Sequence, residues 1–495
     1  MLHNWEKKEE KKEEKKEEGR KSKYIKRFLI GLGCFLIYVL VGGIVPFIHQ
    51  KEVSEEYKTS YRSDLYSKDT VSVDRAAIIE TSTEALDVRL HMINSAKEKI
   101  LLSTFSMKPD EACLRLSAAL YAAAERGVQV EILIDGLSGS WDMKYNAMFY
   151  ALGTHENITI KYYNFFYLYA PWTFNGRLHD KFIVIDDQQL ILGGRNTSNY
   201  FLGNYNKKVL SYDREVYVYN TADTAKDSVI AEVQDYFGGL WNCDVSKIVY
   251  DKIPWLKKKA VKNAVEDYQN LYAKMQEEQP ELWAQDVDYE ANTVSVNHIS
   301  LISNPTHILS KEPYVWYTLV QLMKEADQEV LIQTPYLVLN DGMYRDLTEI
   351  GNDLKKYEVL TNSLAVGDNI CASSDYKYSR PKILATGIDV YEFQGDHSMH
   401  NKSLVIDNHL SIVGSFNFDM RSAYLDTETM LVIDGEEFAS QLESNIRAMQ
   451  EESLLVLEDG SYAPKDEVEP ANLSAKKQRI FSILPWVLRP FRFLL

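Results

Sequence analysis

The side chains in this sequence that could carry out chemistry lie in two segments that match each other. Residues 179–196 read HDKFIVIDDQQLILGGRN, and residues 400–417 read HNKSLVIDNHLSIVGSFN. The positions that agree in register are His179, Lys181, Asp186, Gly193, Gly194 and Asn196 in the first segment and His400, Lys402, Asp407, Gly414, Ser415 and Asn417 in the second. This agreement predicts an internal duplication whose two copies serve one function.

Each copy is predicted to present an imidazole, a cation and an amide on one surface. The apolar tetrapeptides FIVI and SLVI, which follow the two lysines, are typical of strands, and residues i and i+2 of a strand face the same side. A histidine can attack phosphorus or protonate a leaving oxygen, while lysine and asparagine can hold the non-bridging oxygens. Two facing copies therefore suit cleavage of a phosphodiester. Besides the lysines, the residues expected to bind the phosphate are Asn196, Asn417, Gly194 and Ser415.

The acidic residues in and after the motifs are given different roles. Asp186 and Asp407 are counted with the catalytic set, although holding structure or a neighbouring charge suits them better than reaction. A histidine nucleophile needs an acceptor that orients its other ring nitrogen. Asp213 and Glu428, on the strand after each motif, are the expected acceptors, and Glu215 is an alternative to Asp213. No metal is expected, because each motif lysine would repel a cation and neither motif offers a third ligand at metal spacing.

These segments resemble the phospholipase D superfamily, whose mark is His-x-Lys-x4-Asp followed by Gly-Gly or Gly-Ser. The resemblance to bacterial cardiolipin synthases includes RLHDKFIVID, GGRN, VLTNSLAVGDN and GSFNFDMRSAYLDTE, and it covers residues 76–495. It implies two tandem α-β-α domains with mixed sheets, packed as a pseudo-dimer. It also implies a ping-pong reaction without metal or other cofactor. One histidine, His179 by analogy, would form a phosphatidyl-histidine, and His400 would act as acid and then base, although the motifs are too alike to assign the nucleophile.

Several functions remain open at this point. A transferase making cardiolipin or a related lipid, with phosphatidylglycerol as acceptor, is the leading hypothesis. A phospholipase D-type hydrolase that releases phosphatidic acid would use the same residues. A nuclease is disfavoured by the membrane anchor and by the formal net charge of −17, which predicts no basic face for nucleic acid. A non-enzymatic lipid-binding scaffold is disfavoured because both motifs are intact. The expected partners are phospholipids and a membrane, and the oligomeric state is not predicted.

The elements that must hold the motifs indicate an α/β fold. A strand at 99–105, a helix at 114–126 and a strand at 128–134 predict a parallel pair with a crossover helix. The same order of elements returns in the second half, with strands at 329–334 and 356–361. The four cysteines show no CxxC pair and are expected to be buried thiols.

The N-terminal region predicts a membrane anchor. Residues 28–48 contain no charged side chain, and a transmembrane helix needs about 20 apolar residues. The basic cluster before them predicts a single-pass protein of the cell membrane with a cytoplasmic N-terminus. The predicted divisions are a charged cytoplasmic tail (1–27), the transmembrane helix (28–48), a tether (49–75), the first phospholipase D-like domain (76–245), a helical connector (246–300), the second phospholipase D-like domain (301–455) and a tail whose end suits either the core or a membrane interface (456–495).

Overall fold

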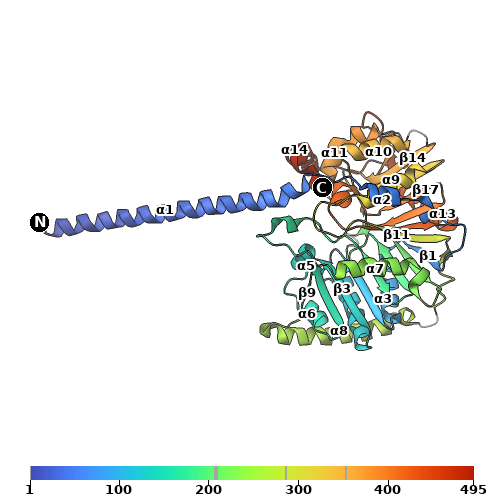
Figure 1. Cartoon of the computed structure of the whole chain (residues 1–495), viewed down its shortest axis with the longest axis horizontal. Coiled ribbons are helices and arrows are strands. Elements are labelled where there is room, and N and C mark those ends of the chain that lie inside the picture. Colours follow the sequence, from blue (N-terminus) through green and yellow to red (C-terminus); the bar gives the residue numbers. More distant parts are fainter. Residues whose placement is uncertain (1, 206–209, 285–286, 352–353) are drawn as a thin grey trace.

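The N-terminal apolar segment forms a long helix that projects from the rest of the molecule. The structure, a computed structural model, describes residues 2–205, 210–284, 287–351 and 354–495. α1 (Leu2–Ile44) is continuous over 43 residues (Figure 1). Of the described residues, only Lys11–Phe47 form a stretch long and apolar enough to cross a membrane, with a mean hydropathy of 2.6 in its most apolar window. α1 ends at Ile44 because Pro46 lies in the 3₁₀ turn η1 (Val45–Phe47) and cannot continue the α-helical hydrogen bonds.

The first half is built on a nine-stranded mixed sheet in the order β10-β1-β8-β6-β5-β2-β3-β4-β9. Its strands are β1 (Asp74–Ile79), β2 (Lys99–Thr104), β3 (Gln129–Asp135), β4 (Ile158–Tyr163), β5 (Phe182–Ile185), β6 (Gln189–Gly193), β8 (Glu215–Asn220), β9 (Ser246–Val249) and β10 (Val294–Ser295). β2 and β3 are parallel, as predicted, and α4 connects them. α4 begins after Asp110, which accepts the N–H of Cys113, and it ends near Gly127, whose φ is 96°.

Helices cover this sheet and account for much of the first core. They are α3 (Ser82–Ser95), α4 (Glu111–Glu125), α5 (Gly136–Asp142), α6 (Ala147–Gly153), α7 (Val229–Trp241) and α8 (Lys258–Glu278). The expected connector, 246–300, contains the predicted helix α8, but α8 does not lie free in solvent. Val261, Tyr268 and Met275 of α8 are buried in the core of the first half. β9 and β10 of the same segment form the two edges of the first sheet.

The second half repeats this plan with an eight-stranded sheet in the order β11-β20-β18-β17-β12-β14-β15-β21. Its strands are β11 (His298–Ser303), β12 (Glu329–Gln333), β14 (Lys356–Asn362), β15 (Asp389–Phe393), β17 (Ser403–Ile406), β18 (Leu410–Gly414), β20 (Thr429–Asp434) and β21 (Ser453–Leu455). Its helices are α9 (Tyr314–Lys324), α10 (Asp341–Gly351), α11 (Ile370–Leu384), α12 (Met420–Tyr424), α13 (Glu436–Glu451) and α14 (Ala475–Leu488). β12 and β14 pair in parallel, as the duplication predicts.

The two halves pack against each other through a shared apolar core, so the predicted α/β pseudo-dimer is confirmed. Val184 and Val216 of the first sheet and Val405 and Leu431 of the second belong to one buried cluster. A short parallel pairing also joins the halves, between β7 (Ser211–Tyr212) and β16 (Ser398–Met399). The limits 76–245 and 301–455 of the two domains remain predictions.

The C-terminal tail and the cysteines differ in part from expectation. α14 packs on α11, and Arg492 of the final turn donates to Asp375, so this tail contacts the second half. Ile483, Trp486 and Val487 nevertheless stay exposed, and the membrane-interface role of this tail remains a prediction. The expectation of buried thiols is wrong for Cys34, Cys243 and Cys371, because Cys34 is exposed on α1 and the other two are only partly covered, whereas Cys113 is buried.

Candidate active site

The two histidines occupy equivalent places in the two halves. His179 precedes β5 and His400 precedes β17, and each of these strands forms an antiparallel hairpin with the next strand, β6 or β18. The glycine that ends each hairpin is required by crowding. A Cβ would lie 2.5 Å from a backbone carbonyl oxygen at Gly193 and 2.2 Å from one at Gly414. Each hairpin is thereby pressed closely against the next strand of its sheet.

His179 is held by residues of the second half. Its backbone N–H donates to the hydroxyl oxygen of Thr427 (3.1 Å), and its Nδ1 lies 2.9 Å from Oε1 of Glu428. The N–H of Thr427 in turn donates to the carbonyl oxygen of Arg177 (2.9 Å). The Glu428 side chain is fully buried. The segment before His179 is therefore aligned by the segment before β20.

His400 is held by residues of the first half in the same way. Its backbone N–H donates to the carbonyl oxygen of Tyr212 (2.6 Å), and its Nδ1 lies 2.7 Å from Oδ2 of Asp213. The Asp213 side chain is fully buried. The structure therefore brings Asp213 and Glu428 to the histidines, but each carboxylate contacts the histidine of the opposite half.

These contacts determine which ring nitrogen is available. At His179, a carboxylate that accepts a hydrogen bond from Nδ1–H leaves Nε2 without a proton, as a nucleophile or base needs. At His400, Nδ1 lies 2.7 Å from Oδ2 of Asp213 and also 2.7 Å from Nζ of Lys402. His179 keeps 16% of its side-chain surface exposed and His400 keeps 9%. Both imidazoles thus lie at the edge of a buried polar cluster instead of inside the apolar core.

The two motif lysines are buried beside the histidines. Lys181 donates to the carbonyl oxygen of His179, and Lys402 donates to that of His400. Burial lowers the pKa of Lys181 to about 7 and that of Lys402 to about 8. Burial and the nearby lysines also lower the pKa of His179 well below its usual value, and Lys402 acts on both Lys181 and His179. The cationic groups of the two motifs are therefore close enough to interact electrostatically.

The two motif asparagines sit in matching environments. The side-chain oxygens of Asn196 and Asn417 are buried, and neither has a hydrogen-bond partner among the described residues. Buried polar atoms are almost always paired. The same side-chain oxygen is thus left unpaired at the same motif position in both halves, and phosphate binding by the two asparagines remains a prediction.

Gly194 and Ser415 make contacts within the protein, and their binding of a phosphate remains a prediction. Their backbone N–H groups donate to the carbonyl oxygens of Arg214 (3.3 Å) and Thr429 (2.9 Å), so the sheet uses them. A Cβ at Gly194 would lie 2.3 Å from Oδ1 of Asp213, and the Ser415 hydroxyl donates to Glu428. Each of the two residues contacts one of the orienting carboxylates. Gly194 leaves room for one carboxylate, and Ser415 hydrogen-bonds the other.

Asp186 and Asp407 lie at the far ends of β5 and β17 from the histidines, and their contacts favour a structural role over a catalytic one. Asp186 accepts the backbone N–H groups of residues 97–99, and Asp407 accepts those of residues 327–329. Both have positive φ values, 50° and 51°. They fix the turn of each hairpin to the start of β2 or β12, which is the structural role that the sequence left open for them.

Glu215, the alternative to Asp213, has a different set of partners. Its carboxylate is fully buried and binds the guanidinium groups of Arg89 and Arg195. These two ion pairs satisfy the charge of Glu215 inside the first half. Asp213, not Glu215, is the carboxylate that contacts a histidine.

Aromatic residues that the sequence analysis did not single out form walls around the histidines. The ring of Phe105 lies 5.6 Å from that of His179, and Phe201 lies 5.1 Å from His400, measured between ring centroids. Tyr336 also faces His400, and its hydroxyl donates to Asp368 (2.8 Å). Phe105 and Tyr336 both follow the first parallel strand of their half. Aligning the two halves along their whole length would have revealed this pair.

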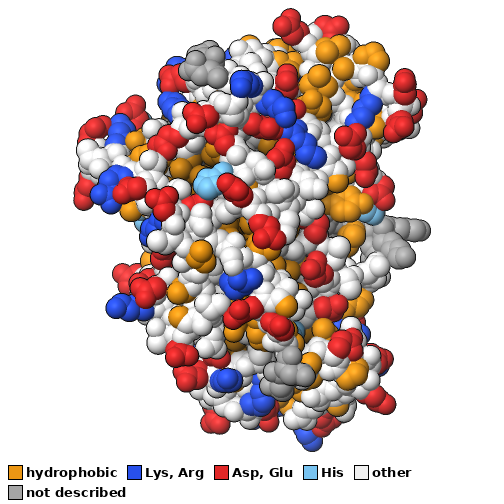
Figure 2. Space-filling model, turned by 90° about the vertical axis from the view of Figure 1, so that its right-hand side faces the viewer, with side chains coloured by type: hydrophobic (Ala, Val, Ile, Leu, Met, Phe, Trp, Pro, Cys, Tyr) orange, Lys and Arg blue, Asp and Glu red, His pale blue; other side chains and the backbone are white. Residues whose placement is uncertain are grey.

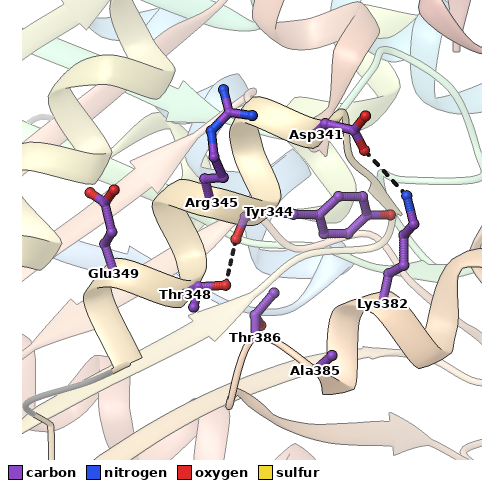
Figure 3. A pocket seen from close by; sticks show the side chains of 8 residues that line it. All are labelled: Asp341, Tyr344, Arg345, Thr348, Glu349, Lys382, Ala385 and Thr386. Atoms are coloured by element: carbon purple, nitrogen blue, oxygen red, sulfur yellow. Dashed lines mark hydrogen bonds and ion pairs between the residues drawn. The ribbon is translucent and has the colours of Figure 1, made fainter.

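A separate cavity lies away from the motifs, between α10 and α11. It has a volume of about 410 Å³, and its walls include Tyr344, Arg345 and Thr386 (Figure 3). Lys382 and Asp341 form an ion pair at its rim, 3.2 Å apart (Figure 3). No residue of the two motifs lines it. The histidine site is therefore not part of this cavity.

Comparisons with known proteins agree with the duplicated plan. The family described as "Cardiolipin synthase, PLD-like domain" matches residues 90–241 and 319–450, so each match contains one motif. An uncharacterized protein of Helicobacter pylori (strain ATCC 700392 / 26695) is 25% identical and covers 87% of this chain and 90% of its own length. Cardiolipin synthase C of Escherichia coli (strain K12) is 24% identical over 74% of this chain and 82% of its own.

A solved structure shares the fold. The crystal structure of phosphatidylserine synthase from Haemophilus influenzae Rd KW20 has a TM-score of 0.59, is 16% identical, and covers 89% of this chain and 100% of its own. Since the family match covers more than half of the chain and includes both histidine motifs, this protein belongs to the cardiolipin synthase family of phospholipase D-like domains.

Proposed function

We propose that the protein is a membrane-bound phosphatidyltransferase, like a cardiolipin synthase, that works through a phosphohistidine. The acceptor in this proposal is the hydroxyl of a phosphatidylglycerol-type lipid. The observation that carries the proposal is the crossed pairing of His179 with Glu428 and of His400 with Asp213. Two imidazoles with oriented Nδ1 atoms, beside two buried lysines, supply one nucleophile, one acid and the cations for a single phosphodiester.

In the first half-reaction, Nε2 of His179 attacks the phosphorus of the donor lipid. A nitrogen–phosphorus bond forms, and the bond between phosphorus and the oxygen of the departing alcohol breaks. His400, protonated, donates its Nε2 proton to that oxygen. Lys181 and Lys402 hold the non-bridging oxygens, and Asn196 and Asn417 are the neutral groups beside them.

In the second half-reaction, the roles of the imidazoles follow from the first. His400, now neutral, removes the proton of the acceptor hydroxyl, and the acceptor oxygen attacks the phosphohistidine. The nitrogen–phosphorus bond breaks, which frees His179 and releases the new diester. Water as the acceptor would give phosphatidic acid instead, so hydrolysis is the alternative outcome of the same chemistry.

The assignment of His179 as the nucleophile is supported by the electrostatics of the two sites. Burial and the lysines lower the pKa of His179 well below its usual value, which keeps it neutral. Burial and the Lys402 ammonium also lower the pKa of His400, and Asp213 opposes this lowering. Burial alone would raise the pKa of Asp213, and Lys402 with His400 holds it below its usual range. An ionised Asp213 favours the protonated form of His400, which a general acid needs.

α1 is the proposed anchor of the protein in the cell membrane. Its apolar part follows a basic cluster that includes Lys26 and Arg27, and such clusters favour the cytoplasmic side. The N-terminus is therefore proposed to be cytoplasmic, with both phospholipase D-like domains on the other side. This arrangement keeps the site next to its lipid substrates.

Product analysis tests the proposed activity. The full chain is incorporated into phosphatidylglycerol vesicles, and lipids are separated by chromatography. Cardiolipin is expected, and His179→Asn or His400→Asn should lower its formation by about 10³-fold or more, since general acid–base and nucleophilic groups are worth this much. Phosphatidic acid without cardiolipin would favour the hydrolase. No lipid product from folded protein would contradict both.

Trapping of the intermediate tests the roles of the histidines. A phosphatidyl ester of p-nitrophenol has a leaving group that needs no acid, so His400→Asn should still release one equivalent of nitrophenol and then stop. Mass spectrometry of that variant should place a phosphatidyl group on His179. A burst from His179→Asn, with the label on His400, would reverse the assignment.

A further inference from the structure

The segment that leads into the first motif carries an exposed apolar tip. Residues 165–174 read FFYLYAPWTF and contain no charged side chain. Leu168 and Tyr169 at the tip are 55% and 69% exposed, and Trp172 is exposed as well. Soluble surfaces rarely expose neighbouring large apolar side chains in this way, and such patches mark contact sites.

The two ends of this segment are held together by hydrogen bonds from polar side chains. The side-chain amide of Asn164 donates to the carbonyl oxygens of Asn175 (2.7 Å) and Gly176 (2.9 Å). Arg177 donates to the carbonyl oxygens of Asn164 (2.7 Å) and Thr173 (2.8 Å). The apolar tip is therefore fixed by the hydrogen bonds of Asn164 and Arg177. Arg177 lies two residues before His179.

The tip contacts α1 directly. The hydroxyl of Tyr38 donates to the carbonyl oxygen of Tyr169 (2.7 Å). A Cβ at Gly42 would lie 2.4 Å from Cγ of Pro171, so the glycine makes room for the proline ring. The side-chain amide of Asn175 donates to the carbonyl oxygen of Gly43 (2.9 Å). These contacts fix the height of the tip along the helix.

That height falls inside the apolar part of a bilayer. Lys26 and Arg27 are the last charged residues before the apolar stretch that begins at Phe28. At about 1.5 Å per residue, Tyr38 lies about 15 Å and Gly43 about 22 Å beyond Phe28. The hydrocarbon core is about 30 Å thick. Even a shift of the helix by one turn, about 5.4 Å, leaves both residues within it.

Several backbone groups of the tip are paired within the protein. The N–H of Ala170 donates to the carbonyl oxygen of Tyr167 (3.0 Å), and that of Thr173 donates to Ala170 (2.9 Å). The N–H of Tyr167 donates to the Thr173 hydroxyl (2.9 Å), and Tyr38 satisfies the carbonyl of Tyr169. Irregular backbone at membrane depth requires such internal partners.

Other elements at the end of the molecule from which α1 projects also carry side chains suited to a membrane surface. α5 and α14, one from each half, lie at the end from which α1 projects (Figure 1). Each carries an exposed tryptophan, Trp141 and Trp486, and tryptophan favours the membrane–water interface. The opposite face of the molecule shows charged side chains of both signs spread over its surface, with groups of hydrophobic side chains between them (Figure 2).

We propose that residues 165–174 insert into the lipid bilayer beside α1, in the leaflet remote from the N-terminus, and thereby hold the His179 site at the bilayer surface. The occupant of this surface is a lipid bilayer. The inference rests on the proposed anchoring by α1, but not on the chemistry of the proposed reaction. A phospholipid would then reach His179 by lateral diffusion within the bilayer, without leaving the membrane.

Site-directed labels measure the insertion without using activity. In a background with Cys243→Ser and Cys371→Ser, an environment-sensitive fluorophore is attached to the native Cys34 in α1, or to Leu168→Cys or Val71→Cys after Cys34→Ser. Val71 is the matched control, because it is 73% exposed and lies three residues before β1. Figure 1 shows β1 at the end of the molecule remote from α1. The labelled full-length proteins are incorporated into phosphatidylglycerol vesicles that carry nitroxide-labelled lipids.

The three positions separate the possible results. Labels at Cys34 and Leu168 should both be quenched by the nitroxide lipids and protected from aqueous iodide, whereas the label at Val71 should show the reverse. Quenching at Cys34 with a Leu168 label as accessible to iodide as Val71 would overturn the insertion while leaving the anchor in place. A Cys34 label open to iodide would overturn the anchor and the insertion together.

Activity adds a second readout. Leu168→Glu should lower turnover of phosphatidylglycerol vesicles by about tenfold or more, because a carboxylate resists entry into hydrocarbon. The same variant should turn over a short-chain, monomeric phosphatidylglycerol at the wild-type rate, and Val71→Glu should change neither rate. An equal loss on vesicles and on the monomeric lipid would show a damaged site and contradict the inference.

Discussion

At the scale of single residues, the two orienting carboxylates are held differently although the motifs match. Asp213 fits beside a glycine, Gly194, whereas the longer Glu428 accepts a hydrogen bond from the Ser415 hydroxyl. Burial raises the pKa of Glu428 to about 8, while the pKa of Asp213 is held below its usual range. The difference between Gly194 and Ser415 thus accompanies a difference in the pKa of the carboxylate that contacts each histidine.

Gly194→Ala tests the room left for Asp213. The new Cβ would lie 2.3 Å from the carboxylate and push it away from His400. We expect kcat to fall by about 10²-fold, the cost of a misplacement of roughly 1 Å, with the fold retained by circular dichroism. Gly238→Ala on α7 is the control, because nothing lies within 4 Å of its added Cβ. Wild-type kcat in Gly194→Ala would show that Asp213 does not need this space.

The pH dependence follows from the buried lysines. Their pKa values, about 7 for Lys181 and about 8 for Lys402, lie below the usual value, so the charged forms are lost as pH rises through 7 to 8. Because the phosphate is held by these charges, kcat/KM should decline as the pH rises through 7 to 8. Steady-state assays on phosphatidylglycerol vesicles between pH 6 and 9 measure the decline. A kcat/KM that stays level to pH 9 would mean that the lysines remain charged.

At the scale of elements, Asp186 and Asp407 fix the hairpins that carry the histidines. Asp186→Ala removes an acceptor for the N–H groups of residues 97–99 and places alanine at a φ of 50°. We expect the free energy of unfolding to fall by about 1–3 kcal/mol, measured by urea denaturation, with kcat within about threefold of wild type since no reacting group is lost. A loss of activity as large as that of His179→Asn, without a change in stability, would favour a catalytic role for Asp186.

The sequence predicted the hairpins that carry the motifs better than it predicted the residues that contact the histidines. The spacing of two residues placed each histidine and lysine on one face, and the matching motifs indicated two equivalent hairpins. The carboxylates were found because they follow the motifs, but their crossed pairing depends on how the halves pack, which no local pattern encodes. Gly194 and Ser415 were predicted to bind the phosphate because a small residue leaves room for a ligand. A small residue equally leaves room for a neighbouring carboxylate, and the sequence does not distinguish the two. Phe105 and Tyr336 lay outside the matched segments.

At the scale of the whole molecule, the site exists only where the two sheets meet. Each histidine takes its carboxylate from the other half, and the two sheets share one buried cluster that includes Val184, Val405 and Leu431. Arg214 also crosses this boundary, because its guanidinium binds Glu80 of the first half and donates to Ser403 of the second. Packing between the halves therefore sets the distance between the two imidazoles.

This dependence separates two core substitutions that are alike in chemistry. Leu431→Ala removes a fully buried side chain from the shared cluster, and Leu116→Ala removes one from the core of the first half alone. Each should lower the free energy of unfolding by about 2–5 kcal/mol. Under conditions where both variants remain folded, kcat should fall in Leu431→Ala by about tenfold or more, because a small shift of one sheet misaligns both crossed pairs, and stay near wild type in Leu116→Ala. Urea denaturation combined with kcat on the same preparations measures both effects. Equal activity in the two variants would mean that the site tolerates movement between the halves, and the crossed carboxylates would then be anchored by their own hydrogen bonds instead of by the shared core.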